Sequence, residues 1–142
     1  MTRGEIVTAA RAWVGTPYRH QASLRSVGCD CLGLVRGVWR ELFGAEPELA
    51  PPYAPDWAEA AGRETLMDAA ERHFARCDAI RAGTLLVFRW KAGTPAKHVG
   101  IAVGPTRFVH AYDAAGRAVE GALVPAWRRR LAGTFDFPGV TD

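Results

Sequence analysis

Cys31 is the residue whose surroundings in the chain most directly suggest chemistry. It stands where a loop gives way to a predicted helix, in the run Gly28-Cys29-Asp30-Cys31-Leu32-Gly33-Leu34-Val35. A thiol at a helix N-terminus faces unpaired backbone N–H groups and the positive end of the helix dipole, and both favour the nucleophilic thiolate. Taken alone, the segment is explained equally well by a small buried cysteine.

Two histidines are predicted to lie side by side on one face of a β-hairpin. Strands are expected over His98–Val103 and Arg107–Tyr112, joined by a three-residue turn with Val103 opposite Arg107. This pairing places Gly100 opposite His110. Because side chains alternate between the two faces of a strand, His98 and His110 then point to the same side. A register slip of one residue would break this arrangement.

The two faces of that hairpin differ in character. One carries an apolar stripe that is typical of a core, and the other carries the histidines with small neighbours that leave room for a site. A thiol, an imidazole base and a second polar group that orients the base are the parts of a nucleophilic cysteine hydrolase. His20 and His73 lack such company and are interpreted as a loop residue and a helix-surface residue.

Several short motifs resemble the NlpC/P60 cysteine peptidases, and in particular their short phage-type members, which include putative cell-wall peptidases of phages and gene transfer agents. The resemblance covers nearly the whole chain and depends on the order and spacing of the motifs. They are Gly15-Thr16-Pro17-Tyr18-Arg19, Asp30-Cys31-Leu32-Gly33-Leu34-Val35, His98-Val99-Gly100-Ile101 and Phe108-Val109-His110-Ala111.

The resemblance implies a papain-like fold and hydrolysis of amide bonds in peptidoglycan stem peptides, often the γ-D-glutamyl-diaminopimelate bond. It implies that Cys31 is the nucleophile, His98 the base and His110 the orienting third residue. By the same resemblance, Tyr18 lines the site near the oxyanion, and Asp30 holds the amino group of the substrate. Asp30 also stands where a helix N-cap is expected, which is the alternative role for its carboxylate.

The chain departs from the family pattern at three points around the expected substrate pocket. Leu32 follows the nucleophile where the family usually has serine. Gln21-Ala22 replaces the Gly-Gly that commonly follows the tyrosine motif, and Tyr18 stands one residue further from Cys31 than is usual. These changes leave the catalytic set intact and concern the pocket.

Along the chain, the expected helices come first and the expected strands follow. This order predicts one α+β domain over residues 1–142, with N-terminal helices packed on a central antiparallel sheet. Thr2-x-x-Glu5 is a capping box that opens a short helix. A second helix is expected over Cys31–Phe43, with Gly44 as its C-terminal stop, and a third over Asp56–Phe74 after a proline-rich connector at 45–55. Further strands are expected over Thr84–Trp90, Ala118–Val124 and Thr134–Phe137.

Composition and charge narrow the class of protein. The chain has 142 residues, 49% apolar and 23% charged, with a net charge of +3. The basic excess is mild apart from Arg128-Arg129-Arg130, so nucleic-acid binding is not expected, whereas an acidic polymer or an acidic partner protein is compatible. Trp127–Arg130 fits docking to a tail partner, contact with stem-peptide carboxylates or simply a solvated basic turn.

The N-terminus has no signal-peptide pattern, and no apolar run approaches a membrane span. The protein is expected to be made in the cytoplasm, to lack a cell-wall-binding domain of its own and to be delivered to the periplasm or cell wall by another protein. That expectation suits a tail component of a phage or phage-like particle. No cofactor and no metal are expected.

Three rival interpretations stay open. Cys29-x-Cys31 with His98 and His110 supplies four soft ligands for a zinc site, although structural zinc sites usually space their cysteines more widely. A redox pair of Cys29 and Cys31 is the second interpretation, and it leaves the histidines unexplained. The third interpretation is a structural tail-tip protein that keeps the fold and has lost the activity.

Overall fold

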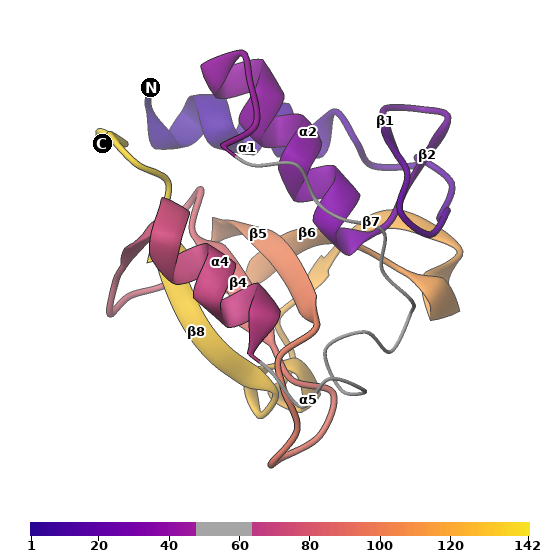
Figure 1. Cartoon of the computed structure of the whole chain (residues 1–142), viewed down its shortest axis with the longest axis vertical. Helices are drawn as coiled ribbons and strands as arrows, with labels where there is room; N and C mark the ends of the chain where they lie inside the picture. The colour runs from indigo at the N-terminus through magenta and orange to yellow at the C-terminus, as the bar shows by residue number, and fades with distance from the viewer. Residues whose placement is uncertain (48–63) are drawn as a thin grey trace.

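The computed structural model of the chain describes residues 1–47 and 64–142, and it has an α+β architecture (Figure 1). The helices are α1 (Arg3–Arg11), α2 (Cys31–Phe43), α4 (Thr65–His73) and α5 (Pro125–Arg128), with a 3₁₀ turn at Asp113–Ala115. The strands are β1 (Ser23–Leu24), β2 (Gly28–Cys29), β3 (Ala75–Arg76), β4 (Leu85–Phe88), β5 (His98–Gly104), β6 (Arg107–Tyr112), β7 (Arg117–Ala122) and β8 (Leu131–Asp136).

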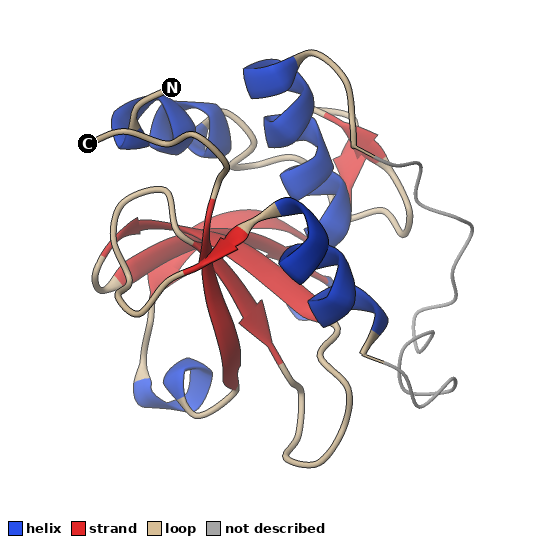
Figure 2. Ribbon diagram, turned by 60° about the vertical axis from the view of Figure 1, so that its left-hand side comes forward, coloured by secondary structure: helices blue, strands red, loops and turns tan. Residues whose placement is uncertain are grey.

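A six-stranded antiparallel sheet in the order β3-β8-β4-β5-β6-β7 forms the centre of the molecule. Helices α1 and α2 lie over one of its faces, and the short α5 lies on the other side of the sheet (Figures 1 and 2). Helix α2 packs against α1 and against strands β5 and β6, which are the strands that carry the two histidines. The predicted α+β fold with N-terminal helices on an antiparallel sheet is therefore confirmed.

Local sequence signals mark the start of α1 and both ends of α2, whereas α1 ends at Arg11, before the stop expected at Gly15. The Thr2 hydroxyl accepts a hydrogen bond of 3.1 Å from the backbone N–H of Glu5, which caps α1. Helix α2 begins at Cys31 and ends at Phe43, and Gly44 follows it with a φ of 86°, a conformation that favours glycine. Both boundaries of α2 match the prediction.

The β5–β6 hairpin has the predicted register away from the turn, but the turn itself differs from the prediction. Ile101 pairs with Val109 and Ala102 with Phe108, as predicted. At the turn, Gly104 rather than Val103 pairs with Arg107, so the predicted three-residue turn is wrong. A β-bulge takes up the extra residue beyond Ala102, and the positions of the histidines are therefore unaffected.

Other elements differ in extent. The stretch 16–30, predicted as loop, contains the short β1–β2 hairpin, and β3 and α5 were not predicted. The third helix is described only over Thr65–His73; the start predicted at Asp56, the residue Trp57 and most of the proline-rich connector lie outside the described residues.

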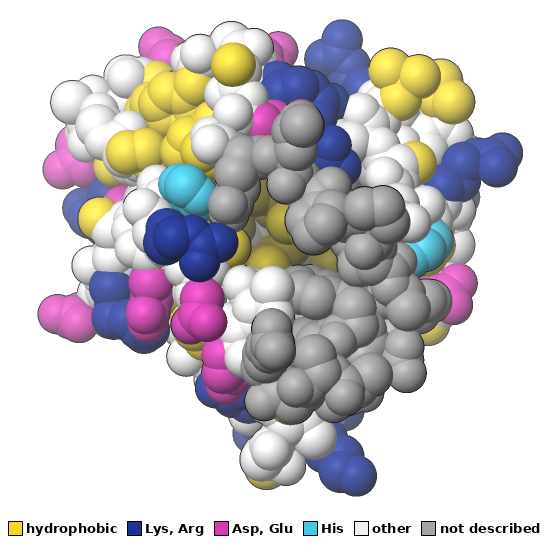
Figure 3. Space-filling view, viewed as in Figure 1, with side chains coloured by type: hydrophobic (Ala, Val, Ile, Leu, Met, Phe, Trp, Pro, Cys, Tyr) yellow, Lys and Arg dark blue, Asp and Glu magenta, His cyan; other side chains and the backbone are white. Residues whose placement is uncertain are grey.

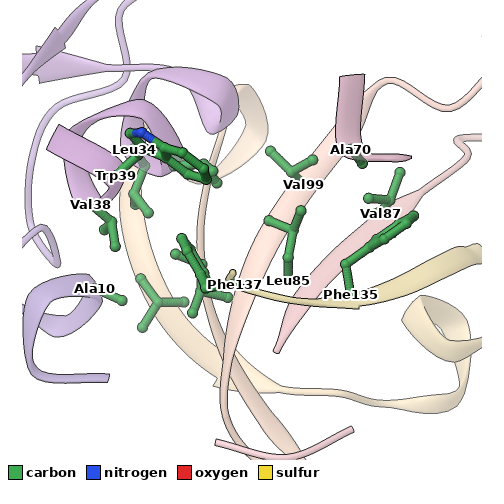
Figure 4. Close-up of a cluster of buried hydrophobic side chains, with 14 of the residues drawn as sticks. Ala10, Leu34, Val38, Trp39, Ala70, Leu85, Val87, Val99, Phe135 and Phe137 are labelled. Carbon is green, nitrogen blue, oxygen red and sulfur yellow. The ribbon is translucent and has the colours of Figure 1, made fainter. Parts of the chain in front are cut away.

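Buried apolar side chains form two clusters on opposite faces of the sheet. The larger one joins α1, α2 and α4 to one face, and Figure 4 shows Ala10, Leu34, Val38 and Val99 within it. The smaller one lies on the other face and is lined by rings and aliphatic side chains: Leu86, Phe88, Ala102, Phe108 and Leu123, with Ile80, Trp127 and Leu131 at its margin. The histidines belong to the face of the smaller cluster.

Charged side chains are distributed in pairs. Arginines form ion pairs with carboxylates on several elements, among them Arg3 with Asp136 and Arg36 with Glu46. On the face that Figure 3 displays, basic and acidic side chains are interspersed and form no basic stripe. Within residues 1–47 and 64–142, no helix is both long and apolar enough to cross a membrane.

Candidate active site

Cys31 is the first residue of α2, and its backbone position is fixed by Asp30. The Asp30 side chain is the N-cap, and its Oδ1 accepts a hydrogen bond of 2.7 Å from the N–H of Gly33. The Cys31 thiol donates to the carbonyl oxygen of Lys97 over 3.9 Å, and the N–H of Val99 also points to the sulfur. The thiol therefore lies against the backbone on both sides of His98.

The electrostatic environment keeps this thiol protonated in the free protein. Burial raises the pKa of Cys31 to about 12, and the negative charge of Asp30 acts in the same direction. The backbone N–H groups of Val99, Leu32 and Cys31 itself lower it without overcoming these two effects. The stabilisation of the thiolate expected from the helix N-terminus is present, but burial and a neighbouring carboxylate outweigh it.

His98 and His110 form a hydrogen-bonded pair. His98 is the first residue of β5 and His110 lies in β6, and Nε2 of His98 is 2.8 Å from Nδ1 of His110. A side chain on Gly100 would collide with Phe108 and crowd the Cβ of His110, so glycine is needed for this close approach. The prediction that both histidines share one face is confirmed.

Both imidazoles are buried, with 1% of His98 and 3% of His110 exposed. Burial holds the pKa of His98 well below its usual range, and the neighbouring His110 lowers it further. Burial also lowers the pKa of His110 to about 4. Both rings are therefore neutral at pH 7, and in a neutral pair one ring nitrogen donates while the other accepts.

Cys31 lies close to the backbone around His98, but its thiol does not contact the imidazole of His98 through a hydrogen bond. In the described part of the chain, no hydrogen bond joins the sulfur of Cys31 to the ring of His98. With Nε2 of His98 engaged by His110, Nδ1 is the ring nitrogen that could exchange a proton with the thiol. Catalytic hydrogen bonds often form only in the substrate complex, so this geometry is compatible with a resting enzyme.

Asp30 has a second structural role that the sequence does not reveal. Its Oδ2 accepts a hydrogen bond of 2.7 Å from the N–H of Gln21, and Nδ1 of His20 lies 3.8 Å from the same oxygen. The side chain is buried, and it ties the loop after Tyr18 to the start of α2. Its predicted role in holding a substrate amine stays a prediction.

The Gln21 backbone has a conformation that glycine adopts most easily. Its φ of 64° lies in the left-handed region, at a position where the family pattern has glycine. The loop thus keeps the conformation that glycine favours without the glycine. Its N–H bond to Asp30 helps to hold it.

Tyr18 lies within electrostatic reach of the thiol. Its N–H donates to the carbonyl oxygen of Gly116, and it bridges to Cys29. Burial raises the pKa of Tyr18 to about 12, with further contributions from the negative charges of Asp30 and Asp113. Tyr18 and Cys31 both border the larger apolar cluster, and the role of Tyr18 near the oxyanion stays a prediction.

The geometry gives little support to the rival metal and redox sites. All three cysteines are free thiols, and Cys29 is fully buried in the larger cluster. Burial and the charge of Asp30 raise the pKa of Cys29 to about 12. In residues 1–47 and 64–142, no three His, Cys, Asp or Glu side chains are arranged to hold a metal ion.

The two tryptophans beside His98 are the part of the site that sequence reasoning missed. Trp90 stacks on His98 with centroids 4.9 Å apart, and Trp127 stacks on it at 5.4 Å. Tyr112 stacks on His110 at 4.8 Å. The sequence signal at Trp127 was the adjacent arginine run, which pointed to a surface role and gave no sign that the indole contacts the histidines.

The chain thus combines a thiol at the start of a helix with a buried histidine pair on the adjoining antiparallel sheet. Residues 15–135 match the model of the NlpC/P60 family, and the chain belongs to that family.

Two curated relatives are similar in sequence. The chain is 31% identical over 128 residues to the murein DD-endopeptidase MepS/murein LD-carboxypeptidase of Escherichia coli strain K12, which covers 90% of this chain and 59% of that protein. It is 26% identical over 139 residues to the gamma-DL-glutamyl hydrolase of Bacillus subtilis strain 168, covering 96% of this chain and 30% of that one. The chain thus spans less than two thirds of the length of these relatives.

Solved structures share the fold. The NlpC/P60 domain of the peptidoglycan hydrolase SagA aligns with a TM-score of 0.63 and 23% identity, over 96% of this chain and all of that one. A NlpC/P60 family protein from Bacillus cereus ATCC 10987 aligns with a TM-score of 0.69 and 16% identity, over 96% of this chain and 40% of that one.

Proposed function

We propose that the protein is a cysteine endopeptidase that hydrolyses amide bonds in peptidoglycan stem peptides, the γ-D-glutamyl-diaminopimelate bond among them. The observation that carries the proposal is the 2.8 Å bond between His98 and His110 beside a thiol that contacts the backbone on both sides of His98. The names of the relatives, a murein endopeptidase and a glutamyl hydrolase, support the substrate class.

The hydrogen-bonded pair assigns the protons. To accept the thiol proton, Nδ1 of His98 must be bare, so its Nε2 carries the hydrogen and donates to Nδ1 of His110. When His98 becomes an imidazolium, this bond to His110 becomes charge-assisted and stronger. His110 thereby orients the base and stabilises its charged form in a buried site.

The reaction then proceeds in two steps, acylation of Cys31 and hydrolysis of the thioester. The sulfur of Cys31 attacks the amide carbonyl carbon while its proton passes to His98, and His98 returns that proton to the leaving amine. The resulting thioester is cleaved by water, which gives one proton to His98 and its hydroxyl to the acyl carbon. The thiolate then recovers the proton. The raised pKa of Cys31 means that the thiol brings its proton to the reaction.

The substrate contacts are also proposals. We infer that Tyr18 lines the oxyanion position; its place beside Cys31 at the margin of the same apolar cluster and the resemblance of its motif support this role. Asp30 would act on a substrate amine through its negative field, since both of its oxygens already accept backbone hydrogen bonds. Leu32 gives the pocket an apolar side chain beside the nucleophile.

We further propose that the protein works as a tail-associated component of a phage or phage-like particle and acts in the periplasm or cell wall. The similarity of its motifs to short phage-type members supports this placement. The net charge of +3 suits contact with an acidic wall polymer.

Mass spectrometry of purified muropeptides digested with the protein tests the activity. The expected result is new products whose masses identify one cleaved amide bond, absent with Cys31→Ala and present with the control Cys77→Ser. A folded wild type that leaves all muropeptides intact would instead favour the structural tail-tip protein that retains the fold.

A further inference from the structure

Trp127 is the one indole in the described residues whose ring contacts both histidines of the site. Its ring centroid lies 5.4 Å from that of His98, with the planes stacked at 26°, and 5.0 Å from that of His110, edge to face at 86°. It also contacts the rings of Phe88, Phe108 and Tyr112. The indole thus bridges the small apolar cluster and the histidine pair.

The short helix that carries Trp127 is fastened on both sides. Arg128 donates to the carbonyl oxygens of Leu123 and Pro105, which holds the helix to the β5–β6 turn. Arg130 donates to the carbonyl oxygen of Trp90, the other tryptophan stacked on His98, and its guanidinium lies 6.0 Å from the Trp127 ring. Two of the three arginines of the basic run therefore hold the indole in place.

We propose that Trp127 is a positioning residue for the catalytic histidine pair: it fixes the planes of both imidazoles and excludes water from them. The proposal rests on the proposed function for its catalytic consequence, and its structural part stands on the ring contacts alone. It also gives the Trp127–Arg130 segment a role other than docking a partner.

The physical consequence follows from solvation. A buried neutral imidazole resists protonation because the imidazolium loses hydration, and removal of a covering indole restores part of that hydration. The titratable groups beside the His98 ring are His110 and Tyr112 from β6, Cys31 of α2 lies against the neighbouring backbone, and the Arg130 guanidinium lies over the Trp127 ring. A substitution at Trp127 removes none of these groups. A change in the pKa values of the two histidines can therefore be attributed to loss of the indole.

The test is NMR titration of the ring signals of His98 and His110 in wild type, Trp127→Phe and Trp127→Ala. In Trp127→Ala, both pKa values are expected to rise by about one unit or more, a tenfold change in proton affinity. Trp127→Phe keeps an aromatic cover and is expected to shift them by less than half as much. On muropeptides, kcat should fall in the same order with KM nearly unchanged.

Two control variants separate positioning from stability. Phe74→Ala removes a ring that packs on Trp39 and Phe137 in the other cluster, and it is expected to lower Tm without moving the histidine titration. Arg129→Ala changes an exposed residue two positions after Trp127, and it should alter neither Tm nor the histidine titration. If Trp127→Ala does not fold, Trp127→Leu takes its place with the same expected direction.

Histidine pKa values that stay unchanged in the folded alanine or leucine variant would overturn the proposal. The titration needs no peptidase activity. A shifted titration in a protein that cleaves no muropeptide would therefore support the positioning role and count against the proposed function alone.

Discussion

Substitution of Asp30 by asparagine should destabilise the protein, because the carboxylate accepts two backbone hydrogen bonds and an amide can accept only one of them. The N–H groups of Gly33 and Gln21 each lie 2.7 Å from a different oxygen of Asp30. In Asp30→Asn, the side-chain oxygen can face one N–H, and the NH₂ group must face the other. One of the two donors then loses its acceptor: the Gly33 N–H in a buried bond, or the Gln21 N–H in a partly buried one.

The size of the loss depends on the burial of that donor. A buried donor without an acceptor costs about 1–3 kcal/mol, and the partly buried Gln21 N–H places the loss toward the lower end of that range. For a domain of this length, that corresponds to a fall in Tm of roughly 3–12 °C. Urea unfolding followed by tryptophan fluorescence measures the free energy directly, with an unchanged m-value as the sign that the unfolded state is unaffected.

An exposed carboxylate near the site provides the matched control. Asp113→Asn should change the free energy of unfolding by less than about 0.5 kcal/mol, as is usual for surface positions. If Asp30→Asn is as stable as Asp113→Asn, the two-bond role of Asp30 is refuted. Kinetics on stem peptides with free and acetylated N-termini then address the amine: a selective loss on the free amine supports binding, and an equal loss on both supports a purely structural carboxylate.

Three further predictions concern the cysteines and histidines. Cys29→Ser and Cys77→Ser should keep most of the activity, and a Cys29→Ser variant as inactive as Cys31→Ala with its fold preserved would favour a metal or redox site. His98→Ala should reduce kcat more than His110→Asn, because asparagine can still accept the hydrogen bond from His98; equal and total loss in both folded variants would contradict the division of roles. The lowered pKa of His110, about 4 against 6.5 in the unfolded chain, stabilises the fold above pH 6.5, and about 3 kcal/mol of this is lost as the pH falls to 4. Urea unfolding from pH 7 to 4 should therefore show a shallower decline for His110→Asn than for wild type, and parallel declines would refute the assignment.

The features predicted correctly from the sequence depend on local signals. Helix α2 is marked by Asp30 before its first turn and Gly44 after its last, and an apolar stripe runs between them. The histidine pair follows from the two-residue period of adjacent strands joined by a short turn. Periodicity and capping act over a few residues, so a single sequence is enough to recognise them.

The missed features depend on contacts between distant segments. Trp127 reaches His98 only because α5 folds back over the sheet, and nothing in the local sequence encodes that return. The second hydrogen bond of Asp30 requires the Gln21 loop to approach α2. The resting pKa of Cys31 likewise depends on burial by several elements, which the helix N-terminus alone does not predict.

Trapping of the covalent intermediate tests the central claim, that Cys31 is the nucleophile, most directly. The protein is mixed with a stem peptide, quenched in acid within milliseconds to seconds and analysed by intact-protein and peptide mass spectrometry. The account predicts an added mass equal to the acyl fragment of the peptide, carried on the segment that contains Cys31 and absent from Cys31→Ala. Undiminished hydrolysis by Cys31→Ala, with no adduct on the wild-type thiol, would contradict it.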